Sequence, residues 1–490
     1  MNQEINSNIG WNFDNSYTSL PNDLMSKIEP EKVAEPKLAI LNQELANELN
    51  LNFYDISKEN LALIFSGNKL PTGSESIAQA YAGHQFGHFT ILGDGRALLI
   101  GEHISKLKKR YDIQLKGSGK TPCSRNGDGR ATLGSMLREY LMSESMNGLK
   151  IPTTRSLAVV TTGEKVIREN IFQGGILTRV ASSHIRVGTF QYLATNGNIE
   201  ALNKLLIYTI NRHYTDIKDN ENLAISLLEK FIDRQISLII NWLRVGFIHG
   251  VQNSDNVTLS GETIDYGPCS FMDYYNPKTV FSSIDHHGRY SFMNQELICH
   301  WNVSRFAETL IPFFSDNQKK SIEIGTNIIN QFNKKFKTEW LKMMKNKLGF
   351  IGNFNEDEIF ISKLLLWMEN NKADYTNTFL YFLDKKENFN EIYNTIEFID
   401  LFKEWENRIS RNKKQNNEHI KIMKKNNPEF IPRNHLVEKA LDEACELNDY
   451  TKFNQILKLT KNAYSKNENT EYKKPASIDF TKKYQTFCGT

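Results

Sequence analysis

The sequence predicts an α+β protein of two lobes, a small β-rich lobe followed by a large, mainly helical one. Short β-prone segments separated by glycine turns lie between residues 89 and 167, and amphipathic helices dominate residues 295–465. Between them, residues 249–273 contain two acidic loops. This order of sheet, acidic loops and helices is the layout of protein-kinase-like enzymes.

The composition is that of an ordinary globular protein. The 490 residues include 60 Lys and Arg and 57 Asp and Glu, and the net charge of +3 gives no reason to expect a nucleic-acid partner. No apolar run reaches the ~20 residues that span a bilayer, and the first residues, MNQEINSNIGWNF, lack the pattern of a signal peptide. The five cysteines form no CxxC motif. We therefore expect a cytoplasmic protein with no membrane or nucleic-acid partner.

The two acidic loops carry the clearest chemical signal. Val257–Leu259 and Glu262–Ile264 are β-prone and are separated by a Ser-Gly turn, so we expect a short hairpin. The hairpin would bring Asp255 and Asn256, which precede it, close to Asp265, which follows it. Two carboxylates and an amide oxygen suit a hard cation such as Mg²⁺. Either loop alone is explained by turn formation, whereas both at this spacing favour a catalytic metal site.

A glycine-rich connection, Gly93-Asp94-Gly95-Arg96, lies between two predicted strands, Phe89–Leu92 and Ala97–Ile100. Backbone N–H groups in such a turn, with an arginine beside them, can hold phosphate. Most glycine turns between strands only close a hairpin, and this alternative stays open. The segment is not a dinucleotide-binding fingerprint, because Leu98 occupies the third glycine position and a strand follows.

Lys116 ends a predicted strand that starts at Tyr111. The next residues, GSGKT, do not form a P-loop, because Gln114 stands where the first glycine is required and Pro122 follows the motif. The next predicted helix carries Glu139 beside its apolar face, from where it could turn inward to Lys116. In kinase-like enzymes, a strand lysine held by a helix glutamate positions the nucleotide phosphates. The alternative is that both side chains face solvent.

The remaining elements are predicted more coarsely. Ser156–Thr162 and Val166–Ile167 would complete a sheet of about five strands with one helix, and residues 174–188 would link the two lobes. A strongly periodic helix, Leu223–Trp242, leads toward the first acidic loop, and another helix is expected over Leu38–Leu51.

We divide the chain accordingly into four parts. These are an amino-terminal extension that packs on the lobes (1–75), the small lobe with the glycine turn, the lysine strand and the glutamate helix (76–185), the helical lobe with the catalytic and metal loops (186–465), and a tail (466–490).

Several stretches together carry a family resemblance. AYAGHQFGHFTILGDGRALLIGEH, YDIQLKGSGKTPCSRNGDGRA, GILTRVASSHIRVGTFQ, HGVQNSDN, TIDYGPCSFMD and DHHGRYSF occur in this order between residue 78 and about residue 295. They resemble the selenoprotein O/YdiU family. The resemblance implies a kinase-like two-lobed fold whose members bind ATP in an inverted orientation and transfer AMP to protein hydroxyl groups, releasing pyrophosphate. Some bacterial members are also credited with UMP transfer from UTP.

Carried over by motif, the resemblance implies roles for individual residues. Asp255 resembles the proton acceptor, Asn256 and Asp265 resemble the ligands of Mg²⁺ or Mn²⁺, and Glu139 resembles the partner of Lys116. The residues that resemble the nucleotide-binding set are Gly93, Gly95, Arg96, Lys116, Asp128, Gly129, Arg179, Arg186 and Asp265. Asp255 and Asn256 are adjacent, whereas their counterparts in ordinary kinases lie five residues apart, a difference that fits a pseudokinase-like catalytic loop.

The tail departs from the family. Members carry cysteine or selenocysteine near the carboxyl terminus, and Cys488 fits that position as a redox candidate. In some bacterial members this residue pairs with a cysteine in the segment after the second acidic loop, but residues 278–283 of this chain offer only serines. Cys269 is the other cysteine near that loop and would be the alternative partner. We expect that the family disulfide is absent.

The sequence thus predicts a metal-dependent protein adenylyltransferase that uses ATP and acts on Ser, Thr or Tyr hydroxyls of protein substrates. The same lobes could support a γ-phosphotransferase acting on a protein or a small molecule. A nucleotide-binding pseudoenzyme is the alternative from a different class. The set of Lys116, Glu139, Asp255, Asn256 and Asp265 argues against it, because a scaffold has little need of both metal ligands.

Overall fold

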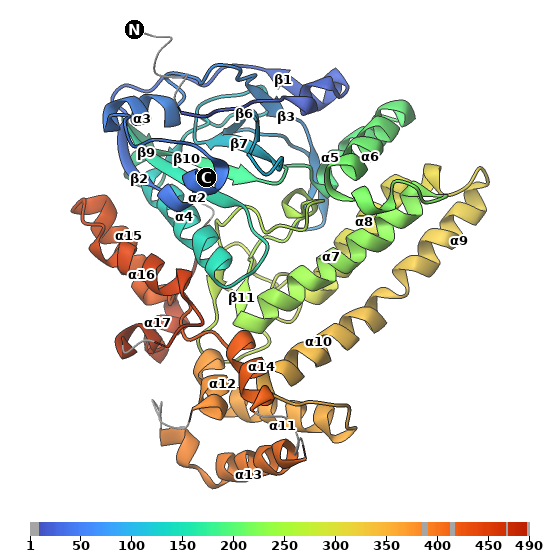
Figure 1. The fold of residues 1–490 in the computed structure, drawn as a ribbon, viewed down its shortest axis with the longest axis vertical. Helices are drawn as coiled ribbons and strands as arrows, with labels where there is room; N and C mark the ends of the chain where they lie inside the picture. Colours follow the sequence, from blue (N-terminus) through green and yellow to red (C-terminus); the bar gives the residue numbers. More distant parts are fainter. Residues whose placement is uncertain (1–8, 385–390, 412–416, 467–468, 488–490) are drawn as a thin grey trace.

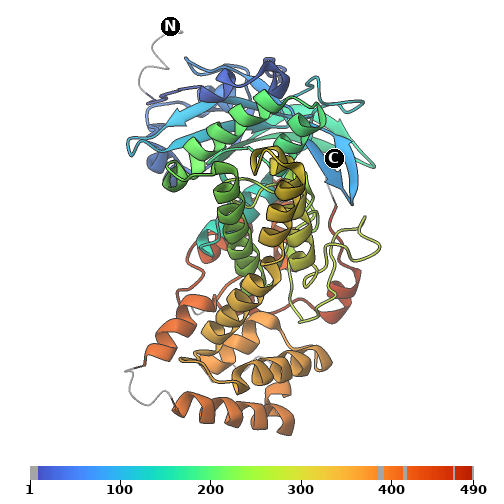
Figure 2. The ribbon, with the colours of Figure 1, turned by 90° about the vertical axis from the view of Figure 1, so that its right-hand side faces the viewer.

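The computed structural model describes residues 9–384, 391–411, 417–466 and 469–487. It has a sheet lobe above a larger group of helices, as both views show (Figure 1, Figure 2). The predicted two-lobed α+β fold is confirmed. Within the described residues, no helix has the length and apolar character needed to cross a membrane.

The main sheet of the described chain has eight strands, which is more than the five that we predicted. Its order is β1-β3-β6-β7-β10-β9-β2, with β8 paired to β10, and each named pair is antiparallel. The strands are β1 (Met25–Lys27), β3 (Ile77–Gln79), β6 (Ala97–Ile104), β7 (Arg110–Lys116), β10 (Ile171–Ala181), β9 (Arg155–Ile167), β2 (Lys37–Leu41) and β8 (Ala131–Thr132).

The first 75 residues supply both edge strands of this sheet and the cover of one face. α2 (Gln43–Leu49) and α3 (Lys58–Phe65) pack on that face, and α4 (Leu133–Gly148) packs on the other. The helix predicted over Leu38–Leu51 is wrong in its first part, because this segment begins as β2, paired with β9. The helix starts only after Asn42, whose side chain caps it. The division of the chain at residues 75, 185 and 465 stays a prediction.

Strands lie on both sides of the glycine turn, as predicted, but they do not pair with each other, so the alternative that the turn only closes a hairpin is wrong. β5 (His88–Ile91) pairs with β4 (Ala82–Gln85) in a separate hairpin, whereas β6 pairs with β3 and β7. Residues 93–96 therefore cross from the hairpin to the main sheet. Gly93 has φ +137°, and a Cβ there would lie 2.3 Å from Cys123 Sγ, so this crossing requires glycine.

The predicted linker at residues 174–188 is mostly strand. β10 lies at the centre of the sheet, between β7 and β9, and Arg186 immediately precedes α5 (Val187–Thr195). The Gly174-Gly175 pair marks a register irregularity that lets the backbone pass close to α4. The two segments predicted as separate strands, Ser156–Thr162 and Val166–Ile167, are one continuous strand, β9.

The predicted hairpin between the acidic loops is also not a paired ladder. Thr258 pairs with Arg186, and Thr263 pairs with Thr153, so each segment finds its partner elsewhere in the chain. The turn itself is present, because Gly261 N donates to Thr258 O at 3.2 Å. The acidic loops are thus held by long-range pairing rather than by each other.

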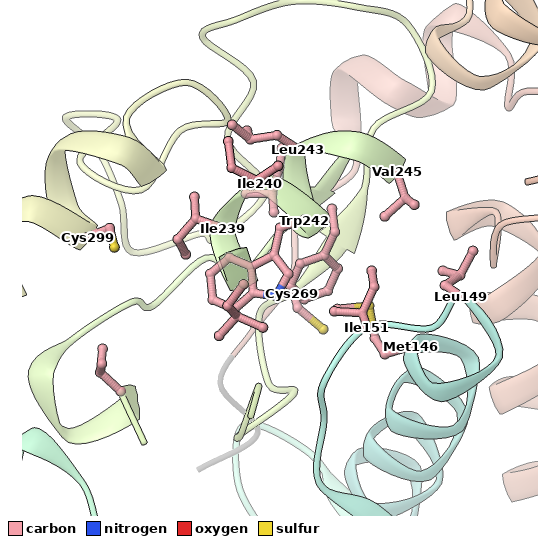
Figure 3. Packing of buried hydrophobic residues seen from close by; sticks show 14 of the residues in the cluster. Met146, Leu149, Ile151, Ile239, Ile240, Trp242, Leu243, Val245, Cys269 and Cys299 are labelled. Carbon is pink, nitrogen blue, oxygen red and sulfur yellow. The ribbon is translucent and has the colours of Figure 1, made fainter. Parts of the chain in front are cut away.

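The helical lobe is built around α7 (Leu223–Val245), which contains the predicted helix and leads through β11 (Phe247–Ile248) to the first acidic loop. Trp242 of α7 is buried and donates to Thr263 Oγ1 at 2.9 Å. Figure 3 shows it among Met146, Ile151 and Cys269. The end of α4, the core of the helical lobe and the second acidic loop therefore share one packed cluster, which fixes their relative positions.

The remaining long helices confirm the predicted helical character of residues 295–465. In chain order they are α8 (Gln295–Leu310), α9 (Gln318–Ile329), α10 (Phe332–Leu348), α11 (Glu356–Asn370), α12 (Tyr375–Leu383), α13 (Ile396–Ser410), α14 (Glu418–Asn426), α15 (Asn434–Glu446) and α16 (Thr451–Lys461). A further helix, α6 (Ile199–His213), precedes α7. α15 and α16 return to pack against α4 (Figure 1).

Candidate active site

A cleft of about 530 Å³ lies between the lobes and brings the predicted site residues together. Its lining includes Gly93, Gly95, Arg96, Lys116, Asp128, Gly129, Glu139, Arg179, Arg186, Asp255, Asn256 and Asp265. Cys488 lies outside the described residues. The cleft thus joins the glycine turn, the end of β7, one face of α4 and both acidic loops.

Four charged side chains form a buried cluster at the back of this cleft. Lys116 Nζ lies 2.7 Å from Glu139 Oε2 and 2.6 Å from Asp265 Oδ1. Arg179, near the end of β10, donates through Nε to Glu139 Oε1 at 2.8 Å and through Nη2 to Asp265. Two cations and two carboxylates therefore compensate one another; three of the side chains are buried, and that of Asp265 is 23% exposed.

The cluster holds both carboxylates in the ionised form. Burial raises the pKa of Glu139, but Arg179 and Lys116 outweigh burial and hold this pKa below its usual value. Burial acts on Asp265 in the same way, and Arg179, Lys116 and Arg186 together hold its pKa well below the usual range. Asp265 also has φ +64°, a left-handed conformation that is strained for a non-glycine residue and is typical of functional sites.

Asp255 has a different environment from Asp265. It lies in the short 3₁₀ turn Ser254–Asn256 and is 6% exposed. Burial raises its pKa to about 6, although the nearby Arg186 opposes this effect. Its Oδ1 is buried and has no hydrogen-bond partner among the described residues. A buried carboxylate oxygen without a partner is costly, so this atom is poised to accept a proton or a ligand.

The β4–β5 hairpin covers Asp255. His84 N donates to Ser254 Oγ at 2.8 Å, and Phe86 N donates to Asn253 Oδ1 at 3.1 Å. Gly83 lies directly over the aspartate, because a Cβ on it would be 2.2 Å from Asp255 Oδ1. The hairpin therefore covers Oδ1 of Asp255, and only glycine leaves room for this approach.

The oxygen donors around Asp255 fit a divalent cation. Asn256 uses its amide nitrogen to donate to Val251 O at 2.9 Å, which leaves its amide oxygen for a ligand. Together with the unpartnered Asp255 Oδ1 and the carboxylate of Asp265, it supplies the hard oxygen atoms that Mg²⁺ and Mn²⁺ prefer. Across the described part of the chain, no group of three or more His, Cys, Asp or Glu side chains could form a metal cage. Mg²⁺ at nucleotide sites is usually held by one or two protein carboxylates, and phosphate oxygens supply further ligands. The few oxygen atoms available here agree with that kind of site.

The opposite side of the cleft is rich in arginine. Arg96 belongs to the glycine turn, and Arg125, Arg130 and Arg168 lie around the loop that contains Asp128 and Gly129. Arg168 pairs with Asp128 at 2.8 Å and so holds the loop against the β9–β10 connection. Arginine binds phosphate through paired N–H donors, so this side suits a polyphosphate.

Three contacts in the site were missed by sequence reasoning. Tyr81 lies under the guanidinium of Arg186, 4.2 Å from the ring centroid. Arg168 lies in a polar connection and carries no motif. Arg138, next to Glu139, donates through Nε to Gly267 O at 3.3 Å and through Nη2 to Cys269 O at 2.8 Å. On the helix that carries Arg138, the kinase-like layout predicted a role for Glu139 only. Of the three residues, Tyr81 alone lies in a stretch whose motif could have indicated a role in the site.

The tail returns to the cleft after α17 (Ile478–Lys483). Arg138 Nη2 donates to Tyr484 Oη at 3.0 Å, and Thr486 Oγ1 donates to Pro268 O at 2.7 Å. Thr486 also pairs with Ser282. The tail therefore lies beside residues 278–283, the segment that offers only serines, and it supports the second acidic loop. The absence of a disulfide at Cys488 stays a prediction.

Comparison with known proteins gives one consistent result. The family model described as "Protein adenylyltransferase SelO" matches residues 8–461. A protein nucleotidyltransferase YdiU of Pelagibacter ubique is 54% identical to this chain, over 98% of this chain and all of that protein. A protein of the same name from Brevibacillus brevis is 51% identical over 98% of both chains.

The kinase domain of a Toxoplasma gondii rhoptry antigen is a more distant match among solved structures. It is 9% identical, has a TM-score of 0.24, and covers 56% of this chain and 88% of its own. This likeness is too weak to support a statement about the present fold.

Proposed function

This chain belongs to the SelO family of protein adenylyltransferases and is a protein nucleotidyltransferase, and from this premise we propose the reaction and the residue roles. We propose that it transfers AMP from ATP to a hydroxyl group of a protein, with Mg²⁺ or Mn²⁺ bound in the cleft. The observation that carries the proposal is the contrast between two neighbouring carboxylates. Asp265 is held ionised by three cations, whereas Asp255 is buried with an oxygen that has no partner.

The charged cluster would position the nucleotide. Lys116 and Arg179 are fixed by Glu139, so their positive charge is already oriented when phosphates enter the cleft. The arginines around the glycine turn and the Asp128 loop would hold the remaining phosphates. Asn256 and Asp265 would hold the metal ion, which when bound neutralises phosphate charge and stabilises the charge that develops on the leaving group.

Asp255 would accept the proton of the acceptor hydroxyl. The hydroxyl oxygen forms a bond to the α-phosphorus, the bond from that phosphorus to the bridging oxygen breaks, and pyrophosphate leaves. The proton of the hydroxyl passes to the Asp255 carboxylate. Asp255 is 6% exposed and lines the cleft, so an acceptor hydroxyl in the cleft would meet this carboxylate with little competing water.

Labelled nucleotides test the reaction directly. The protein is incubated with Mg²⁺ or Mn²⁺, an acceptor protein, and ATP labelled at either the α or the γ phosphorus. We expect label on protein from the α position only, and Asp255→Asn should remove it. Label from the γ position only would refute AMP transfer and favour the γ-phosphotransferase.

Labelled UTP in parallel decides whether UMP transfer is the better reaction. The cytoplasm remains the proposed location, on the cysteine usage alone.

A further inference from the structure

A second cavity, of about 480 Å³, opens beside the catalytic cleft. Its lining comes from the tip of the β4–β5 hairpin, from residues 284–289 and from the start of α8. The lining residues that bear on the argument are Phe86, His88, Ile284, Arg289 and Leu297. Phe86 and Ile284 line the catalytic cleft as well, so the two cavities adjoin each other at these residues. We call the second cavity the side groove.

The side groove has an apolar floor that is open to solvent. Leu297 is 62% exposed and Ile284 is 51% exposed. Phe89 and Ile91 of the adjoining hairpin are also exposed. Large apolar side chains gathered at one exposed place mark a binding surface more often than single exposed ones do.

One arginine, Arg289, and one acidic residue, Asp285, lie in the lining of the side groove. The carboxylate of Asp285 is buried and accepts from the backbone N–H groups of Arg289 and Tyr290. The guanidinium of Arg289 lies 5.0 Å from the ring centroid of Trp301, and its Nε has no hydrogen-bond partner among the described residues. Because the Asp285 carboxylate is engaged with the backbone, Arg289 is the charged group that an anionic side chain in the groove would contact.

The side groove adjoins the turn that carries Asp255. Phe86 packs edge-on against Tyr290, with ring centroids 5.1 Å apart, and Tyr290 Oη donates to Asn253, two residues before Asp255. Direct contacts therefore connect the lining of the groove to the catalytic turn. A polypeptide segment bound in the side groove would enter the cleft past Phe86 and Ile284, the two residues that both linings share.

We propose that the side groove binds the acceptor segment of the protein substrate. The occupant is an extended polypeptide that places a bulky apolar side chain on Leu297 and Ile284 and an acidic side chain at Arg289. Its Ser, Thr or Tyr hydroxyl then enters the cleft beside Phe86. The inference rests on the proposed function and adds to it a sequence preference that the cleft alone does not supply.

Synthetic peptides test this preference. Each peptide carries one Ser, Thr or Tyr, and its neighbours are either Leu and Glu or Ala and Lys. With α-labelled ATP, the wild-type enzyme should modify the Leu/Glu peptides at least about tenfold more efficiently, since one well-placed apolar contact gives discrimination of this order. Leu297→Asp should raise KM for these peptides by a similar factor and leave KM for ATP unchanged. Arg289→Glu should shift the preference toward lysine.

The controls separate the two proposals. Leu366→Asp changes an equally exposed leucine on α11 and should alter neither KM. The shift in melting temperature caused by ATP and Mg²⁺ should be the same in all variants, which shows that folding and the nucleotide site are intact. If the wild type transfers α-label but neither groove variant changes peptide preference, the side groove inference is overturned and the proposed function stands. If the wild type transfers no α-label to any peptide or protein, the proposed function itself fails.

Discussion

Replacing Glu139 with glutamine tests the buried charge cluster. The side chain of Glu139 is 3% exposed and meets two cations, at 2.7 Å from Lys116 Nζ and 2.8 Å from Arg179 Nε. Glutamine keeps the shape of the residue but removes its negative charge. The two cations, Lys116 and Arg179, are then balanced by the single carboxylate of Asp265. Removing one partner of a buried, hydrogen-bonded ion pair costs about 3–5 kcal/mol. We expect the free energy of unfolding of Glu139→Gln to fall by about this amount.

Lys116→Met makes the complementary change, because it leaves two carboxylates with Arg179 alone. The double variant restores the balance of one cation and one carboxylate. Its loss of stability should therefore be smaller than the sum of the single losses, by about 1–3 kcal/mol. Urea unfolding in the presence of EDTA and without nucleotide measures all three variants. Glu200→Gln on α6 is the control, since its partner Lys204 is solvent-exposed and no change is expected. Losses that add within about 0.5 kcal/mol would refute the coupling.

Three further changes probe the site and its surroundings. Asp265→Ala should lower AMP transfer from α-labelled ATP by at least ~10²-fold, because the residue contacts two cations and is a proposed metal ligand. Activity within a few-fold of wild type would mean that the loop is misassigned. Gly83→Ala should lower kcat, because the Cβ of the new side chain would lie 2.2 Å from Asp255 Oδ1, while the thermal stabilisation by ATP is retained. An unchanged kcat would show that the hairpin does not cover the carboxylate during the reaction. Burial holds the pKa of His184 below its usual 6.5, although Asp112 accepts from its ring at 2.9 Å. Below pH 6.5 the unfolded chain therefore binds more protons than the native chain. The free energy of unfolding then falls as the pH falls, by up to about 1.4 kcal/mol per pH unit. His184→Gln should flatten this slope between pH 6.5 and 5, and an unchanged slope would contradict the assignment.

Local patterns predicted the parts of the site that single elements determine. The strand that ends at Lys116 follows from alternation, and the helix that carries Glu139 follows from its apolar spacing. Both lie where the sequence placed them, since hydrophobic periodicity is set within a few residues. The acidic loops were also located correctly, because Asp and Asn next to turn residues are visible without knowledge of the fold.

The errors lie where distant segments meet. Residues 174–188 were predicted to be a linker, yet residues up to Ala181 belong to β10. The lack of a side chain at Gly175 lets this strand lie close to α4, since a Cβ there would be 2.8 Å from Leu133 Cα. Arg179 was therefore placed in a loop, although it belongs to the central strand. Likewise, the partner of Thr258 is Arg186 and not its neighbour across the turn. Such pairing depends on the whole sheet and leaves no local trace in the sequence.

The contacts of the tail have a consequence for the order in which the enzyme is made. Every residue of the charged cluster and of both acidic loops has left the ribosome long before Tyr484 and Thr486, which join Arg138 and Pro268 beside the second loop. A nascent or interrupted chain that stops short of them would hold Lys116, Glu139 and Asp265 but would lack this support. The second loop is thus expected to reach its full stability only after translation has passed Thr486.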